Sequence, residues 1–107
     1  MPRYMIQETP TPQVVAALLQ NPEDRTEEMR SIFEAAGGSL EGYYLSLENT
    51  VYLIADIPDQ ASLSAIMLAI FARGLLASIR ATPIITASEA VDVFKRAASV
   101  AYRSPGR

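Results

Sequence analysis

The chain has 107 residues, of which 50% are apolar and 20% charged, the size and composition of one globular domain. Its formal net charge of −3 argues against a nucleic-acid partner, which needs a basic face. It contains no Cys and no His, which excludes disulfides, thiolate catalysis, Fe–S clusters, His- or thiolate-bound zinc, His-ligated haem and the Ser-His-Asp triad.

The first half of the chain predicts a strand followed by two helical pieces. Residues 3–8 form the strand, and Thr11 caps a helix that Pro12 begins. Asn21-Pro22 breaks this helix. A second helical piece follows and ends at Gly37-Gly38, with Gly37 in the left-handed conformation. Its first two turns carry four acidic residues, favourable at a helix N-terminus: Glu23, Asp24, Glu27 and Glu28.

The second half predicts a hairpin, a helix, a strand and a last helix. Residues 40–47 and 51–57 are strands joined at Asn49, and the second of them is apolar enough to be central and covered on both faces. Asp59 caps a helix that stops at Gly74, and residues 76–85 form the fourth strand. Residues 86–89 have capping-box spacing. The last helix is expected to turn four apolar residues inward: Val91, Phe94, Ala97 and Ala98.

This order of elements predicts one α+β domain over residues 1–107. The βαββαβ succession is that of the ferredoxin-like fold, in which helices pack on one face of a four-stranded antiparallel sheet. The extra C-terminal helix is an addition to it. The second sheet face must then be covered or polar.

Several segments resemble the GYD-domain family. They are Gly37-Gly38 after an acidic helix, residues 42–47, residues 51–59, residues 78–86 followed by Glu89, and the tail 101–106. The resemblance runs from Pro2 to Gly106. It implies a dimeric α+β barrel, in which two ferredoxin-like subunits press their open sheet faces together, and it implies a homodimer or a higher even oligomer. It implies no established activity, because related barrel families include monooxygenases, isomerases, haem enzymes and ligand sensors.

The chain departs from the family at the residues that name it. The Gly, Tyr and Asp of that motif would fall on Leu47, Asn49 and Thr50, and none of these matches. No role that rests on that Tyr or Asp is carried over.

Alternation along the strands predicts one apolar and one mixed sheet face. Tyr52, Ile54 and Asp56 share the mixed face of one strand, and Ser78, Arg80 and Thr82 that of another. Arg3, Met5 and Gln7 are placed on the same face. Either Tyr43 or Tyr44 must also point that way. Such a mixture suits a dimer interface or an enclosed cleft.

The candidate site residues come from this mixed face. Arg80 is the first choice, as a bidentate donor to a substrate carboxylate or enolate, with Asp56 as a base. The alternative is a salt bridge between strands or subunits. Tyr43, Tyr44, Tyr52 and Gln7 complete the ligand-pocket candidates, although Tyr is also favoured in strands for its shape.

Two functions follow from these candidates. The first is a homo-oligomeric module that binds a small molecule or serves assembly, without catalysis. The alternative is a cofactor-free enzyme of the monooxygenase or isomerase type, with Arg, Tyr and Asp in a pocket between sheet and helices. A third alternative, haem held by a Tyr, would give a coloured preparation. We expect no metal and no cofactor.

No segment predicts contact with a membrane. The longest apolar-rich stretch, residues 63–71, is shorter than the about 20 residues that cross a bilayer. Residues 1–6 lack the apolar run of a signal peptide. Together with the absence of Cys, these features lead us to expect a cytoplasmic protein.

Overall fold

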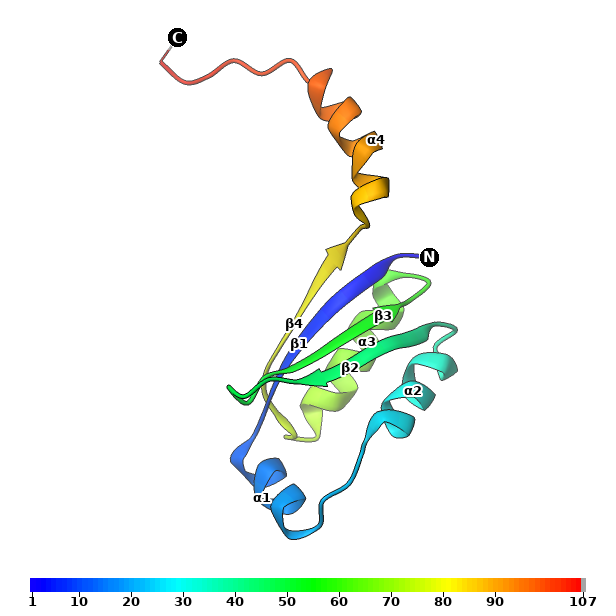
Figure 1. The fold of residues 1–107 in the computed structure, drawn as a ribbon, viewed down its shortest axis with the longest axis vertical. Helices are drawn as coiled ribbons and strands as arrows, with labels where there is room; N and C mark the ends of the chain where they lie inside the picture. Colours follow the sequence, from blue (N-terminus) through cyan, green and yellow to red (C-terminus); the bar gives the residue numbers. More distant parts are fainter. Residues whose placement is uncertain (107) are drawn as a thin grey trace.

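A computed structural model describes residues 1–106, and within them the predicted order of elements is confirmed (Figure 1). The strands are β1 (Arg3–Pro10), β2 (Ser39–Leu45), β3 (Val51–Asp56) and β4 (Leu76–Ile84). The helices are α1 (Pro12–Gln20), α2 (Thr26–Ala35), α3 (Gln60–Ala72) and α4 (Ala87–Ala98).

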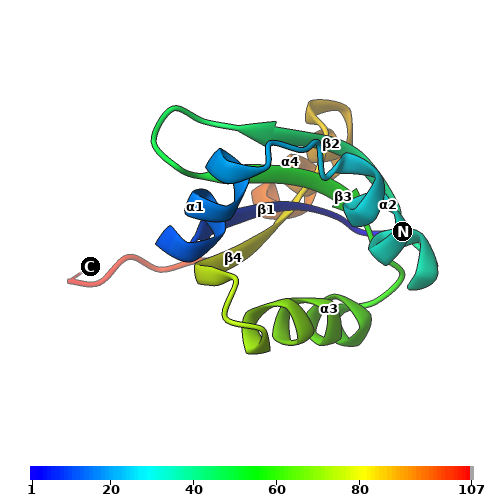
Figure 2. The same cartoon turned by 90° about the horizontal axis from the view of Figure 1, so that it is seen from below.

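The four strands form one antiparallel sheet in the order β2-β3-β1-β4. This is the ferredoxin-like arrangement that the sequence predicts. Strand β1 lies inside the sheet and pairs with β3 on one side and β4 on the other, so it carries residues to the middle of both faces. Figure 2 shows α3 lying along one face of this sheet.

The core lies between that face and the helices. Alternate residues of β1 and β3 point into it, including Ile6 and Leu53, which are almost fully buried. Phe33 of α2 and Leu63 of α3 pack against them. We call this side of the sheet the helix face.

Local signals in the sequence fix the ends of the elements. The Thr11 side chain accepts a hydrogen bond from the Val14 N–H, and Asp59 accepts one from the Ser62 N–H at 2.7 Å. Thr86 and Glu89 form the predicted capping box, with both hydrogen bonds present. Gly37 has a φ of 84°, the predicted left-handed conformation.

Several predicted boundaries are wrong, among them the end of β2, which lies at Leu45 and not at Leu47. Strand β1 continues through Pro10. Proline has no N–H to donate to a neighbouring strand, and the pairing with β4 shifts in register between Thr9 and Pro10, where such a residue is tolerated. Helix α2 begins at Thr26, so Glu23 and Asp24 precede it. The Asp24 carboxylate accepts a hydrogen bond from the Thr26 N–H at 2.9 Å. Asp24 therefore lies in the loop before α2 and not in the first turn of the helix.

Helix α4 projects away from the sheet instead of packing on it (Figure 1). The prediction that its apolar residues face inward is therefore wrong within this chain, and Phe94 is 69% exposed. The radius of gyration is 17.6 Å, against about 13 Å for a compact domain of this length. The helix face is already occupied, because Phe33 of α2 and Leu63 of α3 pack in the core beneath it.

The second sheet face carries no helix from residues 1–106. Strand β3 is therefore covered on one face only, which corrects the expectation of cover on both. None of the helices within residues 1–106 is long and apolar enough to cross a membrane.

Candidate ligand-binding site

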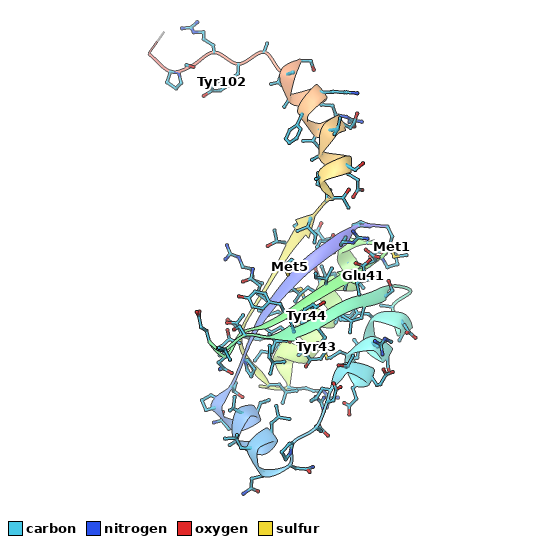
Figure 3. The ribbon with its side chains drawn as sticks, in the orientation of Figure 1. Met1, Met5, Glu41, Tyr43, Tyr44 and Tyr102 are labelled. Carbon is cyan, nitrogen blue, oxygen red and sulfur yellow. The ribbon has the colours of Figure 1, made fainter. Side chains whose placement is uncertain are left out.

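Most of the predicted site residues lie together on the uncovered side of the sheet, which we call the open face. It is formed by Arg3, Met5 and Gln7 of β1, Tyr44 of β2, Tyr52, Ile54 and Asp56 of β3, and Arg80 and Thr82 of β4. Figure 3 shows the side chains of Met5, Glu41 and Tyr44 along the sheet. The predicted mixed face is thus a continuous surface.

Four of the candidates form one row across this face. Tyr44 is opposite Tyr52, Tyr52 is opposite Gln7, and Gln7 is opposite Arg80. Neighbouring members of the row are within reach of one another. Tyr44 is 62% exposed and Arg80 is exposed, so the row is an outer surface of the chain and not a pocket.

Asp56 and Arg80 do not meet. Asp56 is opposite Arg3, four residues along β1 from the position opposite Arg80, which is about 13 Å along a strand. Asp56 instead accepts a hydrogen bond from Arg3 Nε at 3.3 Å. The Arg3 guanidinium also pairs with Glu41 at 2.9 Å, and these two carboxylates raise its pKa.

Tyr43 lies on the helix face, opposite Leu53. Of the two neighbouring tyrosines, it is therefore Tyr44 that belongs to the open face. The irregularity in β2 between Leu40 and Gly42 shifts the alternation of this strand. That shift leaves Tyr43 beside a cavity that the other candidates do not touch.

The cavity has a volume of about 960 Å³ and lies between the helix face and the first three helices. Its walls are mainly apolar, and they include Val14 and Leu18 of α1, Met29 and Ile32 of α2, and Ile66 and Ile70 of α3. Pockets for small molecules have this size range and this kind of lining. A polar group inside it would set the orientation of a ligand.

Glu8 is that group. Its position on β1 is flanked on the same face by Ile6, and the residue is only 6% exposed. Among residues 1–106, no side chain or backbone N–H donates a hydrogen bond to its carboxylate. No fully buried side-chain oxygen of these residues lacks a partner, so the Glu8 oxygens are accessible at the cavity. Burial raises the pKa of Glu8 to about 7, so the carboxyl is partly ionised at neutral pH.

Two further polar side chains line the same cavity. Burial raises the pKa of the Tyr43 hydroxyl, and the charge of Glu8 raises it further, so Tyr43 stays a hydrogen-bond donor at neutral pH. Arg25 stands on the segment that precedes α2, where its guanidinium pairs with Glu23 at 2.7 Å and Glu28 at 2.8 Å. These ion pairs raise the pKa of Arg25.

Glu8 was not among the predicted site residues, although the sequence carries a signal for it. Tyr4, Ile6 and Glu8 alternate on β1, so a carboxylate follows two apolar residues on the face that packs under helices. The prediction used only the other set of this strand. The predicted strand also ended at Glu8, whereas β1 continues to Pro10.

A comparison with protein families matches residues 4–93 to the GYD domain. The chain belongs to the GYD domain family. The resemblance read from the sequence is thereby confirmed, even though the residues that name the motif differ here. A comparison with curated proteins found no match.

Solved structures similar to this GYD domain share its fold. One is protein Atu4242 from Agrobacterium tumefaciens, at 16% identity and a TM-score of 0.52, with 81% of this chain and 94% of that chain covered. Another is an uncharacterized NIPSNAP domain protein from Burkholderia xenovorans, at 16% identity and a TM-score of 0.52, covering 82% and 96%. A third, an antibiotic biosynthesis monooxygenase, has 12% identity and a TM-score of 0.49, covering 80% and 98%.

Because this GYD domain has no Cys and no His, its polar contacts to a ligand come from carboxyl, hydroxyl, amide and guanidinium groups. Within residues 1–106, no cluster of carboxylates is arranged to hold a metal ion. The cavity is open on one side and has room for an apolar molecule, beside one carboxyl group and one phenol, from Glu8 and Tyr43. The open face instead offers a broad surface of mixed character.

Proposed function

We propose that this GYD domain binds a small, mainly apolar molecule in the cavity under α1, α2 and α3. The proposal is carried by Glu8, a residue only 6% exposed that lines the cavity and whose carboxylate has no hydrogen-bond partner among residues 1–106. Its oxygens remain accessible, because no fully buried side-chain oxygen of these residues lacks a partner. A molecule held in the cavity can therefore pair with Glu8.

A fluorescent apolar probe tests this proposal. N-phenyl-1-naphthylamine carries one N–H donor on two aromatic groups, so it suits both the walls and Glu8. Ala69→Phe adds a phenyl ring to a methyl group in the lining of the cavity. Ala72→Phe makes the same change one turn later on α3, outside the lining.

We expect the wild type and Ala72→Phe to enhance the fluorescence of the probe with the same dissociation constant. Ala69→Phe should bind it at least about tenfold more weakly, because the added ring occupies the space for the probe. Equal binding by the two variants, or no binding by the wild type, would overturn the proposal.

Assembly into a homodimer through the open face is the second part of the proposal. Its support is the composition of this face, where Met5, Tyr52 and Ile54 lie at the centre and the ion pair of Arg3 with Asp56 lies near one end. A sheet face with this much apolar surface needs cover. The absence of Cys supports a cytoplasmic setting for the assembly.

Helix α4 supports the same conclusion. It has 12 residues, and helices shorter than about 12–15 residues are marginal in water without tertiary packing. Its apolar residues, Val91 and Phe94 among them, are exposed in the single chain. We include this stripe in the proposed interface with a second copy.

Size-exclusion chromatography with light scattering tests the assembly. The wild type should elute as a dimer of the 11.6-kDa chain or a larger even oligomer. Ile54→Lys places a charge in the middle of the open face and should give monomers. Ser31→Lys on the exposed side of α2 is the matched control. A monomeric wild type would remove this part of the proposal and leave the cavity untouched.

A catalytic role has less support. The alternative of a cofactor-free enzyme placed Arg80, Asp56 and tyrosines in one pocket between sheet and helices. Arg80 and Asp56 lie on the open face and only Tyr43 lies beside the cavity. Binding is therefore the function that the geometry favours.

A further inference from the structure

The unpartnered carboxylate of Glu8 restricts which ligands the cavity can accept. Glu8 is 6% exposed and lies on the helix face of β1, opposite Val51 and Ile79. Both neighbours are aliphatic, so neither can donate a hydrogen bond. Ionised, this carboxylate is a negative charge largely removed from water, and an opposite charge beside it stabilises it.

The charged groups around the cavity do not supply that pair. Helix α1 contributes none, because its sequence is uncharged. The segment that leads into α2 contributes Glu23, Asp24, Arg25 and Glu28, β2 contributes Tyr43, and the end of α3 contributes Arg73. Arg25 is already engaged by Glu23 and Glu28. Burial alone accounts for the raised pKa of Glu8, with no contribution from either arginine.

The lining as a whole is acidic. It contains four carboxylates, those of Glu8, Glu23, Asp24 and Glu28, against the two guanidinium groups of Arg25 and Arg73. A cavity whose lining carries an excess of charge of one sign attracts small ions of the opposite sign. Anionic ligands meet repulsion at the mouth and again at Glu8.

We propose that the ligand of this cavity is an apolar organic cation, an amine whose ammonium group pairs with the Glu8 carboxylate while its hydrocarbon part lies against the walls. The inference rests on the proposed function, since it names the class of molecule that the same cavity binds. An ammonium group brings both a positive charge and N–H donors, and charge-assisted hydrogen bonds are about twice as strong as neutral ones. The Tyr43 hydroxyl is a further polar group at the same cavity.

Recognition of a cation through Glu8 depends on pH. Glu8 must be ionised to pair with an ammonium group, and its pKa of about 7 means that the ionised form dominates only above neutral pH. The other carboxylates of the lining stand nearer the mouth, where the pKa of Asp24 is lowered by hydrogen bonds from Thr26. A preference for amines should therefore increase between pH 5.5 and pH 8.

Two matched probes separate charge from shape. 1-Naphthylmethylamine is a cation at pH 8, and 1-naphthylmethanol is a neutral molecule of nearly the same size. Isothermal titration calorimetry of both probes is carried out on the wild-type chain, on Glu8→Gln and on Glu48→Gln. Glu48 lies in the β2–β3 hairpin outside the lining, so its replacement makes the same change in net charge.

We expect the wild type and Glu48→Gln to bind the amine about tenfold or more tightly than the alcohol at pH 8. Glu8→Gln should bind the two probes equally, and the wild type should lose most of its preference at pH 5.5. Equal affinities in the wild type, or a preference that survives Glu8→Gln, would overturn the inference and leave the cavity as a site for neutral molecules. Failure of both probes to bind would overturn the proposed function as well.

Discussion

Replacement of Glu8 by Gln should make the folded domain more stable at alkaline pH. Gln has nearly the same shape but cannot ionise. The pKa of Glu8 rises from an ordinary value of 4.5 to about 7 in the folded chain, because burial disfavours the charged form. The folded state therefore holds this proton more tightly than the unfolded state does.

The sign and size of the effect follow from this difference. The stabilising contribution of the neutral carboxyl is fully present below pH 4.5 and is lost as the pH rises through about 7. Each pH unit between the two pKa values is worth about 1.4 kcal/mol. The wild type should thus lose about 3 kcal/mol of unfolding free energy between pH 4.5 and pH 8.

Urea unfolding at a fixed protein concentration measures this loss. With a dependence on urea of about 1–3 kcal/mol per molar, the wild-type midpoint should fall by about 1–3 M between pH 5 and pH 8, while that of Glu8→Gln changes little. Fixed concentration matters because assembly also contributes to stability. Work above pH 5 avoids the carboxylates whose pKa values are lowered by hydrogen bonds, which lose their stabilising effect in acid: Asp24, Asp59 and Glu89.

Glu48→Gln serves as the control and should follow the wild type at every pH. If the wild-type midpoint stays constant over this range, or if Glu8→Gln falls in parallel with it, Glu8 is not a buried unpaired carboxyl. The reasoning about the cavity would then be refuted.

The remaining predictions concern the caps and one close approach. Asp59→Ala should cost about 1 kcal/mol of unfolding free energy, because it removes the N-cap of α3, and Asp59→Asn should retain most of it in the same urea assay. Thr86→Ala should lower the helical circular dichroism signal, because α4 loses half of its capping box; an unchanged signal would contradict the account of how α4 begins. Gly38→Ala should cost about 1–3 kcal/mol, because a Cβ there collides with the carbonyl oxygen of Asp56, whereas Ala at the exposed Ser39 should be neutral, and equal effects would contradict that packing.

The parts of this fold that depend on neighbouring residues could be predicted from the sequence. The caps at Thr11, Asp59 and Thr86 satisfy N–H groups within the same turn, so their chemistry can be read from a few letters. The same holds for the left-handed Gly37. The ferredoxin-like order followed from these boundaries, and the open-face sets of β1, β3 and β4 followed from alternation.

The parts that depend on distant residues could not be predicted in this way. The face of Tyr43 depends on an irregularity in β2, which no local pattern shows. Whether Asp56 meets Arg80 or Arg3 depends on how β1 registers with both of its neighbours. The direction of α4 depends on what surface is left for it, since its amphipathic pattern suits a partner chain as well as the domain's own core.

The missing candidate, Glu8, is a different case. No role was predicted for this charge, whereas its spacing from Tyr4 and Ile6 places it among buried residues. A charge that breaks an apolar alternation is a conflict between local preference and fold, and such conflicts gather at functional sites. The spacing, and not the residue type, carried the useful signal.

The titration of Glu8 itself tests the central claim most directly. Carbon-13 NMR of the Glu8 side-chain carboxyl carbon, assigned with Glu8→Gln, reports its protonation with and without 1-naphthylmethylamine. The account predicts a midpoint near pH 7 in the free protein, as burial sets it, and a decrease of about one pH unit or more when the amine is bound at saturation. A midpoint near 4.5, the ordinary value for Glu, unchanged by the amine, would contradict both the buried site and the ligand class.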